Sequence, residues 1–205
     1  MKALLVGATG TIGSAVARLL RQHGVEIIGA HRKSAPPLDI TSPASIAAFY
    51  AQLGQVDAVI CTAGAAGFNS LGKLSDEDVE LSVRSKLLGQ VNLVRKGLDH
   101  LNPGGVFILT GGVLAYSPLP KTSMIALVNG GLESFARAAA LDLTDGRRIV
   151  VVHPDWVDVT AAKAGVQLPN LPTADETATA YWQALDGATT GEPVFVAGHA
   201  PRGKA

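Results

Sequence analysis

The sequence predicts one domain over residues 1–205 with an α/β fold, in which helices cover both faces of a parallel sheet of about seven strands. Two observations predict it. Segments that are apolar throughout alternate along the chain with segments of helical periodicity, as in sheets whose strands are buried on both faces. A length of 205 residues suffices for one well-buried core and leaves little for a second domain. Because right-handed crossovers place a helix layer on each side of such a sheet, the fold is doubly wound.

The first half of the chain contains three expected strands and two expected helices. The first helix follows a glycine-rich turn and carries apolar residues at helical spacing up to Gly24. Ser42 and Pro43 favour a helix start, and Gly54 is typical of the position after a helix end. The expected strands are 2–6, 25–30 and 56–62, and the expected helices are 11–23 and 42–53.

The second half of the chain continues the alternation. Ser75 and Asp78 resemble a capping box that opens a long helix, and the run Asn102-Pro103-Gly104-Gly105 favours a turn. Only a short segment, around 154–174, is left for the substrate side of the domain. The expected helices are 75–100, 123–143 and 175–185, and the expected strands are 106–110, 147–154 and 192–197.

Composition narrows the classes of partner. Seventeen basic and seventeen acidic side chains give a formal net charge of zero, so there is no electrostatic footprint for nucleic acid or an anionic membrane. The N-terminal apolar run is too short for a signal peptide and no later run approaches membrane-spanning length, so we expect a cytoplasmic protein. The single cysteine, Cys61, excludes a disulfide framework and a cysteine-based metal site. We expect small molecules or further copies of the chain as partners, and no metal.

Residues 7–13, GATGTIG, have the spacing of a phosphate-binding turn between a strand and a helix. Gly7 permits the tight turn, Gly10 lets the backbone approach a pyrophosphate, and Gly13 lets the helix pack against the strand. The phosphates would lie at the N-terminus of the helix, where free N–H groups and the helix dipole favour anions. The alternative is a compact turn without a ligand. The order of strand, turn and helix favours a dinucleotide cofactor and a Rossmann-type fold.

The end of the second strand favours NADP(H) over NAD(H). An NAD site would place an acidic residue about 20 positions after the glycines to bind the ribose 2′-hydroxyl. This chain has His31, Arg32 and Lys33 there, followed by Ser34 as a further donor. A guanidinium matches a 2′-phosphate in charge and in fork geometry. The alternative is a solvated basic turn.

With these segments the chain resembles the short-chain dehydrogenase/reductase family over nearly its whole length. GATGTIG is similar to the family's glycine-rich loop, LDIT around Asp39 to its adenine-contacting element, and CTAG to its NAG element, with Thr62 replacing asparagine. SKLLGQVNLV, RIVVVHPDWVDVT and TGEPVFVAG resemble its central helix, its cofactor-contacting PG loop and its last strand. The resemblance implies cofactor binding by Gly7, Thr9, Gly10, Thr11, Ile12, Gly13, His31, Arg32, Lys33, Asp39, Ile40, Ala63, Gly64 and Pro154.

The family's usual catalytic residues are missing. The family uses a tyrosine that exchanges a proton with the substrate oxygen, and a lysine four residues later on the same helix face. No Tyr-x-x-x-Lys occurs in the sequence, because the residues four after its three tyrosines are Gly54, Pro120 and Leu185. The chain is therefore similar to a divergent subgroup lacking the usual Ser/Tyr/Lys residues. Alignment on the family puts Ile125 at the tyrosine position, Asn129 at the lysine, Gly111 or Thr110 at the serine, and Lys86 at the asparagine.

Three residues are candidates for a substitute proton donor. Lys86 would act as an acid or base if burial lowered its pKa, although an exposed or ion-paired lysine is the plainer expectation. Thr110 is the one arguable survivor of the catalytic set, and Tyr116 follows a strand end, where ligands bind in such sheets. A relay through His153 and Asp155 is a further possibility, against a role in binding loop backbone.

Three functions remain open at the level of the sequence. The first is an NADP(H)-dependent oxidoreductase acting on a small carbonyl or alcohol with non-standard proton donors. The second is a catalytically inactive NADP(H)-binding or sensor protein, and a weaker third is an enzyme that acts on a nucleotide-sugar or isomerises its substrate. The resemblance also implies a homodimer or homotetramer, and the small residues of 123–143 permit close approach of a partner helix.

Overall fold

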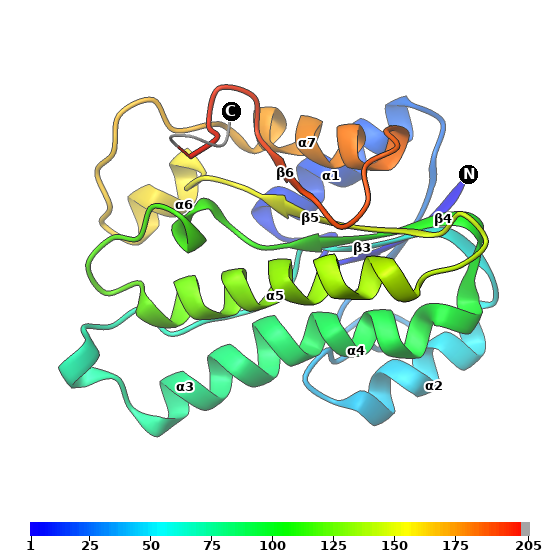
Figure 1. Ribbon diagram of the computed structural model, residues 1–205, viewed down its shortest axis with the longest axis horizontal. Coiled ribbons are helices and arrows are strands. Elements are labelled where there is room, and N and C mark those ends of the chain that lie inside the picture. The colour runs from blue at the N-terminus through cyan, green and yellow to red at the C-terminus, as the bar shows by residue number, and fades with distance from the viewer. Residues whose placement is uncertain (202–205) are drawn as a thin grey trace.

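Six parallel strands form a single sheet in the computed structural model, which describes residues 1–201 (Figure 1). The strand order is β2-β1-β3-β4-β5-β6, so the chain moves outward from β1 to β2 and then returns past β1 to β3. This reversal creates a crevice at the carboxyl ends of β1 and β3, which is where open α/β sheets bind ligands. The strands are β1 (Lys2–Val6), β2 (Glu26–Ala30), β3 (Val56–Cys61), β4 (Leu101–Thr110), β5 (Arg148–His153) and β6 (Pro193–Phe195).

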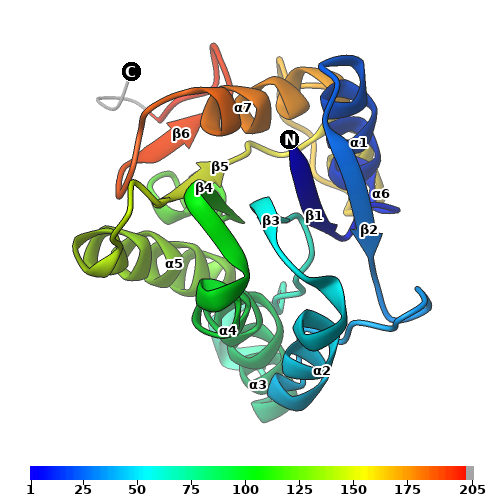
Figure 2. The same cartoon turned by 90° about the vertical axis from the view of Figure 1, so that its right-hand side faces the viewer.

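Helices cover both faces of the sheet, as the sequence predicts. Figure 2 shows α1 and α7 on one face and α2, α4 and α5 on the other. Within residues 1–201, no helix is both long and apolar enough to cross a membrane. The helices are α1 (Thr11–Gln22), α2 (Pro43–Leu53), α3 (Asp76–Ser82), α4 (Leu88–Gly97), α5 (Ser123–Asp142), α6 (Asp158–Lys163) and α7 (Ala174–Asp186).

The alternation of side chains along each strand divides the core into two layers. Leu5 of β1 and Ile60 of β3 pack towards α1 and α7, in a cluster that includes Leu20 and Tyr181. The neighbouring Leu4 packs on the other face, in a cluster with side chains of α2, α4 and α5. Both layers bury the central strands β1, β3, β4 and β5, which explains why these strands are largely apolar rather than alternating, whereas the edge strand β2 is partly exposed.

The element boundaries differ from the sequence-based expectation at three places. About seven strands were expected, but the described residues contain six, because only residues 31–42 connect β2 to α2 and they include Pro36 and Pro37. A further helix and strand do not fit in this connection. β4 begins at Leu101 rather than after the predicted turn, with an irregular register opposite Val56 and Ala58. The short helix α6 lies within the segment expected to form only a connection.

The long helix expected from the capping box contains a π-helical turn. The Ser75 hydroxyl accepts from the Asp78 N–H and the Asp78 carboxylate accepts from the Ser75 N–H, which confirms the capping box. Residues Val83–Leu87 then form a π-helix between α3 and α4. Single π turns inside α-helices are rare and frequently lie at functional sites. This one carries Ser85 and Lys86.

The glycine turn holds the start of α1 tightly against the ends of β1 and β3. A Cβ atom on Gly13 would lie 2.1 Å from the Gly7 carbonyl oxygen and 2.6 Å from Thr62 Oγ1. Gly7 has φ +88° and similar crowding from Thr62 and Ala63. The Thr62 hydroxyl in turn donates to the Val6 carbonyl at 3.1 Å. A side chain at Gly13 would therefore push the helix away from the sheet.

We predict that Gly13→Ala lowers the free energy of unfolding by about 3 kcal/mol, because the added methyl group has no space against backbone atoms. The matched control is Gly130→Ala in α5, where an added Cβ meets nothing within 4 Å. The control should raise stability by about 0.5–1 kcal/mol, because alanine is the better helix former. Chemical denaturation measures both values, and an equal effect of the two substitutions would contradict the packing argument.

Candidate functional site

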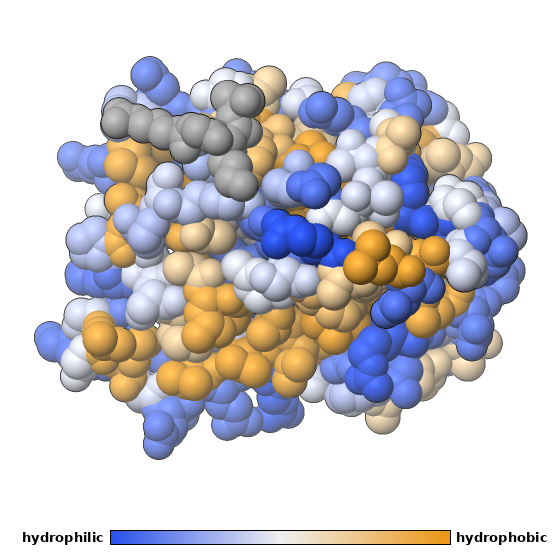
Figure 3. Space-filling view, viewed as in Figure 1, coloured by the Kyte–Doolittle hydropathy of each residue, from blue (hydrophilic) through white to orange (hydrophobic). Residues whose placement is uncertain are grey.

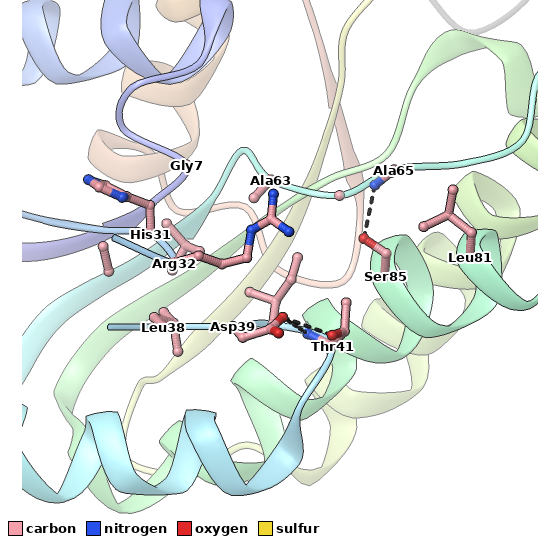
Figure 4. A pocket seen from close by; sticks show the side chains of 14 residues that line it. Gly7, His31, Arg32, Leu38, Asp39, Thr41, Ala63, Ala65, Leu81 and Ser85 are labelled. Atoms are coloured by element: carbon pink, nitrogen blue, oxygen red, sulfur yellow. Dashed lines mark hydrogen bonds between the residues drawn. The ribbon is translucent and has the colours of Figure 1, made fainter. Parts of the chain in front are cut away.

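A cavity of about 440 Å³ opens at the carboxyl ends of β1, β2 and β3. Figure 4 shows that the Arg32 side chain extends into the space between Ala63 and Asp39. The cavity contains seven of the fourteen residues expected to bind a cofactor, namely Gly7, His31, Arg32, Asp39, Ile40, Ala63 and Gly64. Leu38 and Thr41 of the segment LDIT also line it, as do Leu81 and Ser85, and the sequence predicted no contact role for these four residues.

Arg32 provides a positive charge at this cavity without forming an ion pair with a described residue. Its side chain is exposed, and none of residues 1–201 forms a hydrogen bond or ion pair with its guanidinium. His31 Nδ1 accepts from the Lys33 N–H at 3.1 Å. The Ser34 hydroxyl contacts the His31 and Pro36 carbonyls within its own turn. These contacts occupy the hydroxyl that the sequence predicted to be a further donor to the ligand. Lys33 is exposed and does not line the cavity.

Asp39 is held as a carboxylate at the opposite wall. Its Oδ1 accepts from both the N–H and the hydroxyl of Thr41, at 2.9 and 2.8 Å. These hydrogen bonds, with a smaller contribution from the charge of Arg32, keep the pKa of Asp39 below its ordinary value. The Thr41 contacts leave the second carboxylate oxygen for a ligand donor such as an exocyclic amine.

The N-terminus of α1 fits the pyrophosphate of a dinucleotide. Gly10 caps the helix without a side chain, and the first turn carries no acidic residue. The backbone N–H groups of this turn therefore remain available to an anion, which the helix dipole also favours. A Cβ on Gly10 would contact only the Gly7 carbonyl oxygen, at 3.4 Å, so the outer side of the turn is open. Thr9, Gly10 and Thr11 form this turn, with Gly7 at the first cavity and Ile12 at a second.

The second cavity, of about 190 Å³, lies at the ends of β4 and β5. Its wall is largely apolar and includes Ile12, Ile125 and Val157. Pro154 also lines it, and polar groups come from Lys86, Thr110, Asn129, Asp155, Trp156 and Thr160. The two cavities are neighbours, because Ser85 lines the first and Lys86 the second. Both open at the carboxyl edge of the sheet, and the two cavities are together called the cleft.

Lys86 is partly buried in this second cavity. Its Nζ donates to the Gly111 carbonyl at 3.0 Å, and its backbone packs on Gly64, where an added Cβ would lie 3.1 Å from the Lys86 Cα. No carboxylate of the described chain lies within ion-pair distance of it. Burial lowers the pKa of Lys86 to about 8. The expected exposed or ion-paired lysine is therefore not what the structure contains.

Thr110 and Tyr116 use their hydroxyls inside the protein. The Thr110 hydroxyl lies 2.5 Å from the Cys61 carbonyl and 2.6 Å from the Tyr181 hydroxyl. Tyr116 donates to the Glu133 carboxylate, and burial together with that carboxylate raises the pKa of Tyr116. Tyr116 does not line the Lys86 cavity. These contacts make neither hydroxyl a suitable proton donor to a ligand there.

His153 also belongs to the interior. Its side chain is fully buried, Nδ1 lies 3.1 Å from the Gly112 nitrogen, and Nε2 lies 3.5 Å from Glu133 Oε2. Burial lowers the pKa of His153 and keeps the ring neutral. The Asp155 carboxylate accepts from the Trp156 N–H and lies 3.7 Å from His199. The two residues thus bind different groups, and the relay expected between them is not formed.

Comparison with known proteins agrees with this geometry. A family model described as enoyl-(acyl carrier protein) reductase matches residues 7–185. The chain belongs to the short-chain dehydrogenase/reductase family. The crystal structure of the protein lin1944 from Listeria innocua is 39% identical, with a TM-score of 0.90, and the match covers 96% of this chain and 99% of that one. A crystal structure described as a small-chain dehydrogenase in complex with NADPH has a TM-score of 0.86 at 23% identity and supports the fold alone.

Curated relatives in the family are longer than this chain. Tetrahydroxynaphthalene reductase of Pyricularia oryzae is 28% identical over 70% of this chain and 53% of its own length. Versicolorin reductase 1 of Aspergillus parasiticus is 26% identical over 82% of this chain and 74% of its own length. A short-chain dehydrogenase/reductase of Aspergillus aculeatus matches over only 36% of its length. The activities of these relatives therefore do not transfer directly.

Within the short-chain dehydrogenase/reductase fold, several site residues carried no sequence signal. Gln90 donates to the Lys86 and Thr110 carbonyls and accepts from the Thr110 N–H, which fastens the helix to the end of β4. The Glu133 carboxylate accepts hydrogen bonds from Tyr116 and Arg137, and it lies 3.5 Å from His153 Nε2. These residues lie far apart in sequence, and only helix packing brings them to the strand ends.

We predict that Tyr116→Phe lowers the free energy of unfolding by about 1–2 kcal/mol, because buried Glu133 loses a donor. Affinity for NADPH, measured by fluorescence titration, should stay unchanged, because Tyr116 lies outside both cavities. Urea denaturation gives the stability, and Glu133→Gln with the double variant completes a cycle that isolates the pair. A marked loss of NADPH affinity with unaltered stability would instead place the hydroxyl at the ligand.

Proposed function

We propose that this short-chain dehydrogenase/reductase binds NADP(H) and acts as an oxidoreductase on a small carbonyl or alcohol substrate. One observation carries the proposal. Two cavities lie at the carboxyl edge of the sheet: Arg32 lines the first, Lys86 lines the second, and the N-terminus of α1 has no side-chain cap. The positive groups at these places match the phosphates of NADP(H), and the apolar second cavity suits the nicotinamide and a small substrate.

NADP(H) would be held by groups along the whole cleft. Arg32 and His31 would bind the 2′-phosphate, the backbone of Thr11 and Ile12 the pyrophosphate, and Asp39 the adenine. When bound, the cofactor supplies a hydride, and the protein orients the substrate and manages one proton. The preference over NAD(H) is supported by Arg32, whose guanidinium forms no hydrogen bond or ion pair within residues 1–201. The NADPH found in a neighbour of the same fold is consistent with it.

A second candidate function is NADP(H) binding without turnover. It is favoured by Ile125 and Asn129 at the positions of the family's tyrosine and lysine, since Ile125 has no proton to exchange. In such a sensor the cleft would serve only to recognise the cofactor. The two functions differ in whether any alcohol or carbonyl changes the absorbance of the bound nicotinamide.

We further propose that the chain forms a homodimer or homotetramer through the face around α5. Leu127 and Leu141 on α5 are 53% and 88% exposed. Figure 3 shows apolar side chains gathered over this part of the molecule. Contiguous exposed apolar surface of this kind is typical of association sites. The small residues of α5 let a second helix approach closely.

We predict that NADPH binds at least tenfold more tightly than NADH, and that Arg32→Met lowers affinity for NADPH by about 10- to 100-fold. NADH affinity should change less than about threefold, because only the 2′-phosphate loses its partner. Calorimetry with both cofactors measures this. The control is Arg21→Met, an exposed arginine in the last turn of α1 that does not line the cavity. Equal losses for the two cofactors would refute the assignment of Arg32 to the phosphate.

We predict that light scattering finds an oligomer for the wild-type chain and a smaller species for Leu127→Glu, because a buried unpaired carboxylate opposes association. Leu71→Glu provides the control, since Leu71 is 79% exposed but lies in the turn Leu71–Lys73, outside α5. A monomeric wild-type protein would refute the proposed assembly. Loss of the oligomer in both variants would place the interface elsewhere.

A further inference from the structure

The second cavity contains polar groups that the fold leaves without partners. Asn129 is 1% exposed, and its Oδ1 has no hydrogen-bond partner, whereas its Nδ2 donates to the Gly112 carbonyl at 3.3 Å. Trp156 Nε1 is likewise buried without a partner. Lys86 has one protein acceptor, the Gly111 carbonyl, for three N–H hydrogens. Buried polar groups are nearly always hydrogen-bonded, so these groups indicate a ligand that brings both an acceptor and a donor.

Lys86 and Asn129 approach the cavity from two different helical segments. Lys86 lies in the π turn Val83–Leu87 and Asn129 lies in α5. They bind the carbonyls of two consecutive residues, Gly111 and Gly112, just after β4. Each side chain is thereby anchored by one polar contact and presents its remaining polar hydrogens or oxygen at the cavity. Both glycines are closely packed, because a Cβ on Gly111 would lie 2.7 Å from His153 and a Cβ on Gly112 would lie 2.7 Å from Asn129.

We propose that Lys86 is the proton donor and acceptor for the substrate oxygen in this cavity, and that Asn129 accepts a hydrogen bond from a ligand hydroxyl beside it. The inference rests on the proposed oxidoreductase function and names its acid and base. In carbonyl reduction an N–H bond of the Lys86 ammonium breaks and an O–H bond forms on the substrate oxygen. The hydride and its two electrons reach the carbonyl carbon from NADPH, and water reprotonates the neutral amine.

The electrostatic surroundings suit this role. The Cys61 thiol is fully buried and burial raises its pKa to about 12, so it stays neutral. His153 is neutral because burial lowers its pKa. Asp155 is the one carboxylate that lines the cavity, and its oxygens contact the Trp156 N–H and His199. Lys86 forms no ion pair with Asp155 or any other described carboxylate, and burial lowers its pKa to about 8, which is close to the optimum for transferring a proton near neutral pH.

The proposal sets the direction of the pH dependence. Reduction needs the ammonium, so its rate should fall as pH rises through about 8, whereas oxidation of the alcohol needs the neutral amine and should rise over the same range. Lys86→Arg keeps the charge but cannot release the proton, because an arginine stays protonated. Lys86→Met removes the charge and keeps most of the length of the chain.

The first experiment is ¹³C NMR of the lysine side chains during a pH titration of the full chain, without and with NADP⁺. We expect one lysine to titrate near pH 8 in the wild type and in the control Lys96→Met, an exposed lysine of α4, and to be missing in Lys86→Met. If every lysine titrates near the ordinary pKa of about 10.4, the role of Lys86 is overturned whatever the activity.

The second experiment follows NADPH oxidation with a panel of small aldehydes, ketones and hydroxyketones, with NADPH affinity measured in parallel. Lys86→Met and Lys86→Arg should lower kcat by about 100-fold or more, the magnitude of general acid catalysis, and Lys86→Arg should lose the pH dependence near 8. NADPH binding with wild-type turnover that survives in Lys86→Met would overturn this inference and leave the proposed function standing. NADPH binding without turnover of any panel member would overturn the oxidoreductase function, and the proton role with it.

The variant Asn129→Leu tests whether the hydroxyl that donates to Asn129 belongs to the cofactor or to the substrate. A loss of NADPH affinity of about tenfold in the absence of substrate would assign the hydroxyl to the cofactor. An equal rise in KM for hydroxyketones, with NADPH affinity and the KM for simple ketones unchanged, would assign it to the substrate. No change in either quantity would overturn the role of Asn129.

Discussion

The contact between the glycine turn and the ends of β1 and β3 is the constraint on which the site depends. Gly13 lies so close to the Gly7 carbonyl and to Thr62 that only a hydrogen atom fits. This packing fixes the N-terminus of α1 at the point where the strand order reverses. The N–H groups of the first turn, Arg32 at the end of β2 and the residues after β3 then meet at one cleft.

The second half of the site depends on the backbone that follows β4. Gln90 donates to the Thr110 carbonyl, Lys86 to the Gly111 carbonyl and Asn129 to the Gly112 carbonyl. Side chains thus supply the hydrogen bonds that a neighbouring strand would supply within the sheet. Buried carbonyls left unpaired would cost about 1–3 kcal/mol each. The same side chains that stabilise the loop therefore define the floor of the second cavity.

By the resemblance to the family, the ammonium and the amide of the catalytic positions are exchanged between two helical segments in this chain. The ammonium lies on the π turn at Lys86 and the amide lies on α5 at Asn129, whereas the family pattern has the amide on the central helix and the lysine on the following one. Both types of group remain in the cavity although neither stands at its usual position. Tyr116 does not replace the missing catalytic tyrosine, because its hydroxyl donates a hydrogen bond to the Glu133 carboxylate.

The sequence by itself determined the doubly wound sheet, the order of its elements along the chain, and the place of the glycine turn and Arg32 at the first cavity. Strands buried on both faces and the spacing of Gly7, Gly10 and Gly13 are local features, and parallel strands bring their ends to one edge. Tertiary structure alone decided that Lys86 is partly buried without an ion pair among residues 1–201, and that the hydroxyls of Thr110 and Tyr116 are bound by groups inside the protein. Those outcomes depend on which helix faces which strand end, and spacing along the chain does not encode the direction of a side chain across a packed interface.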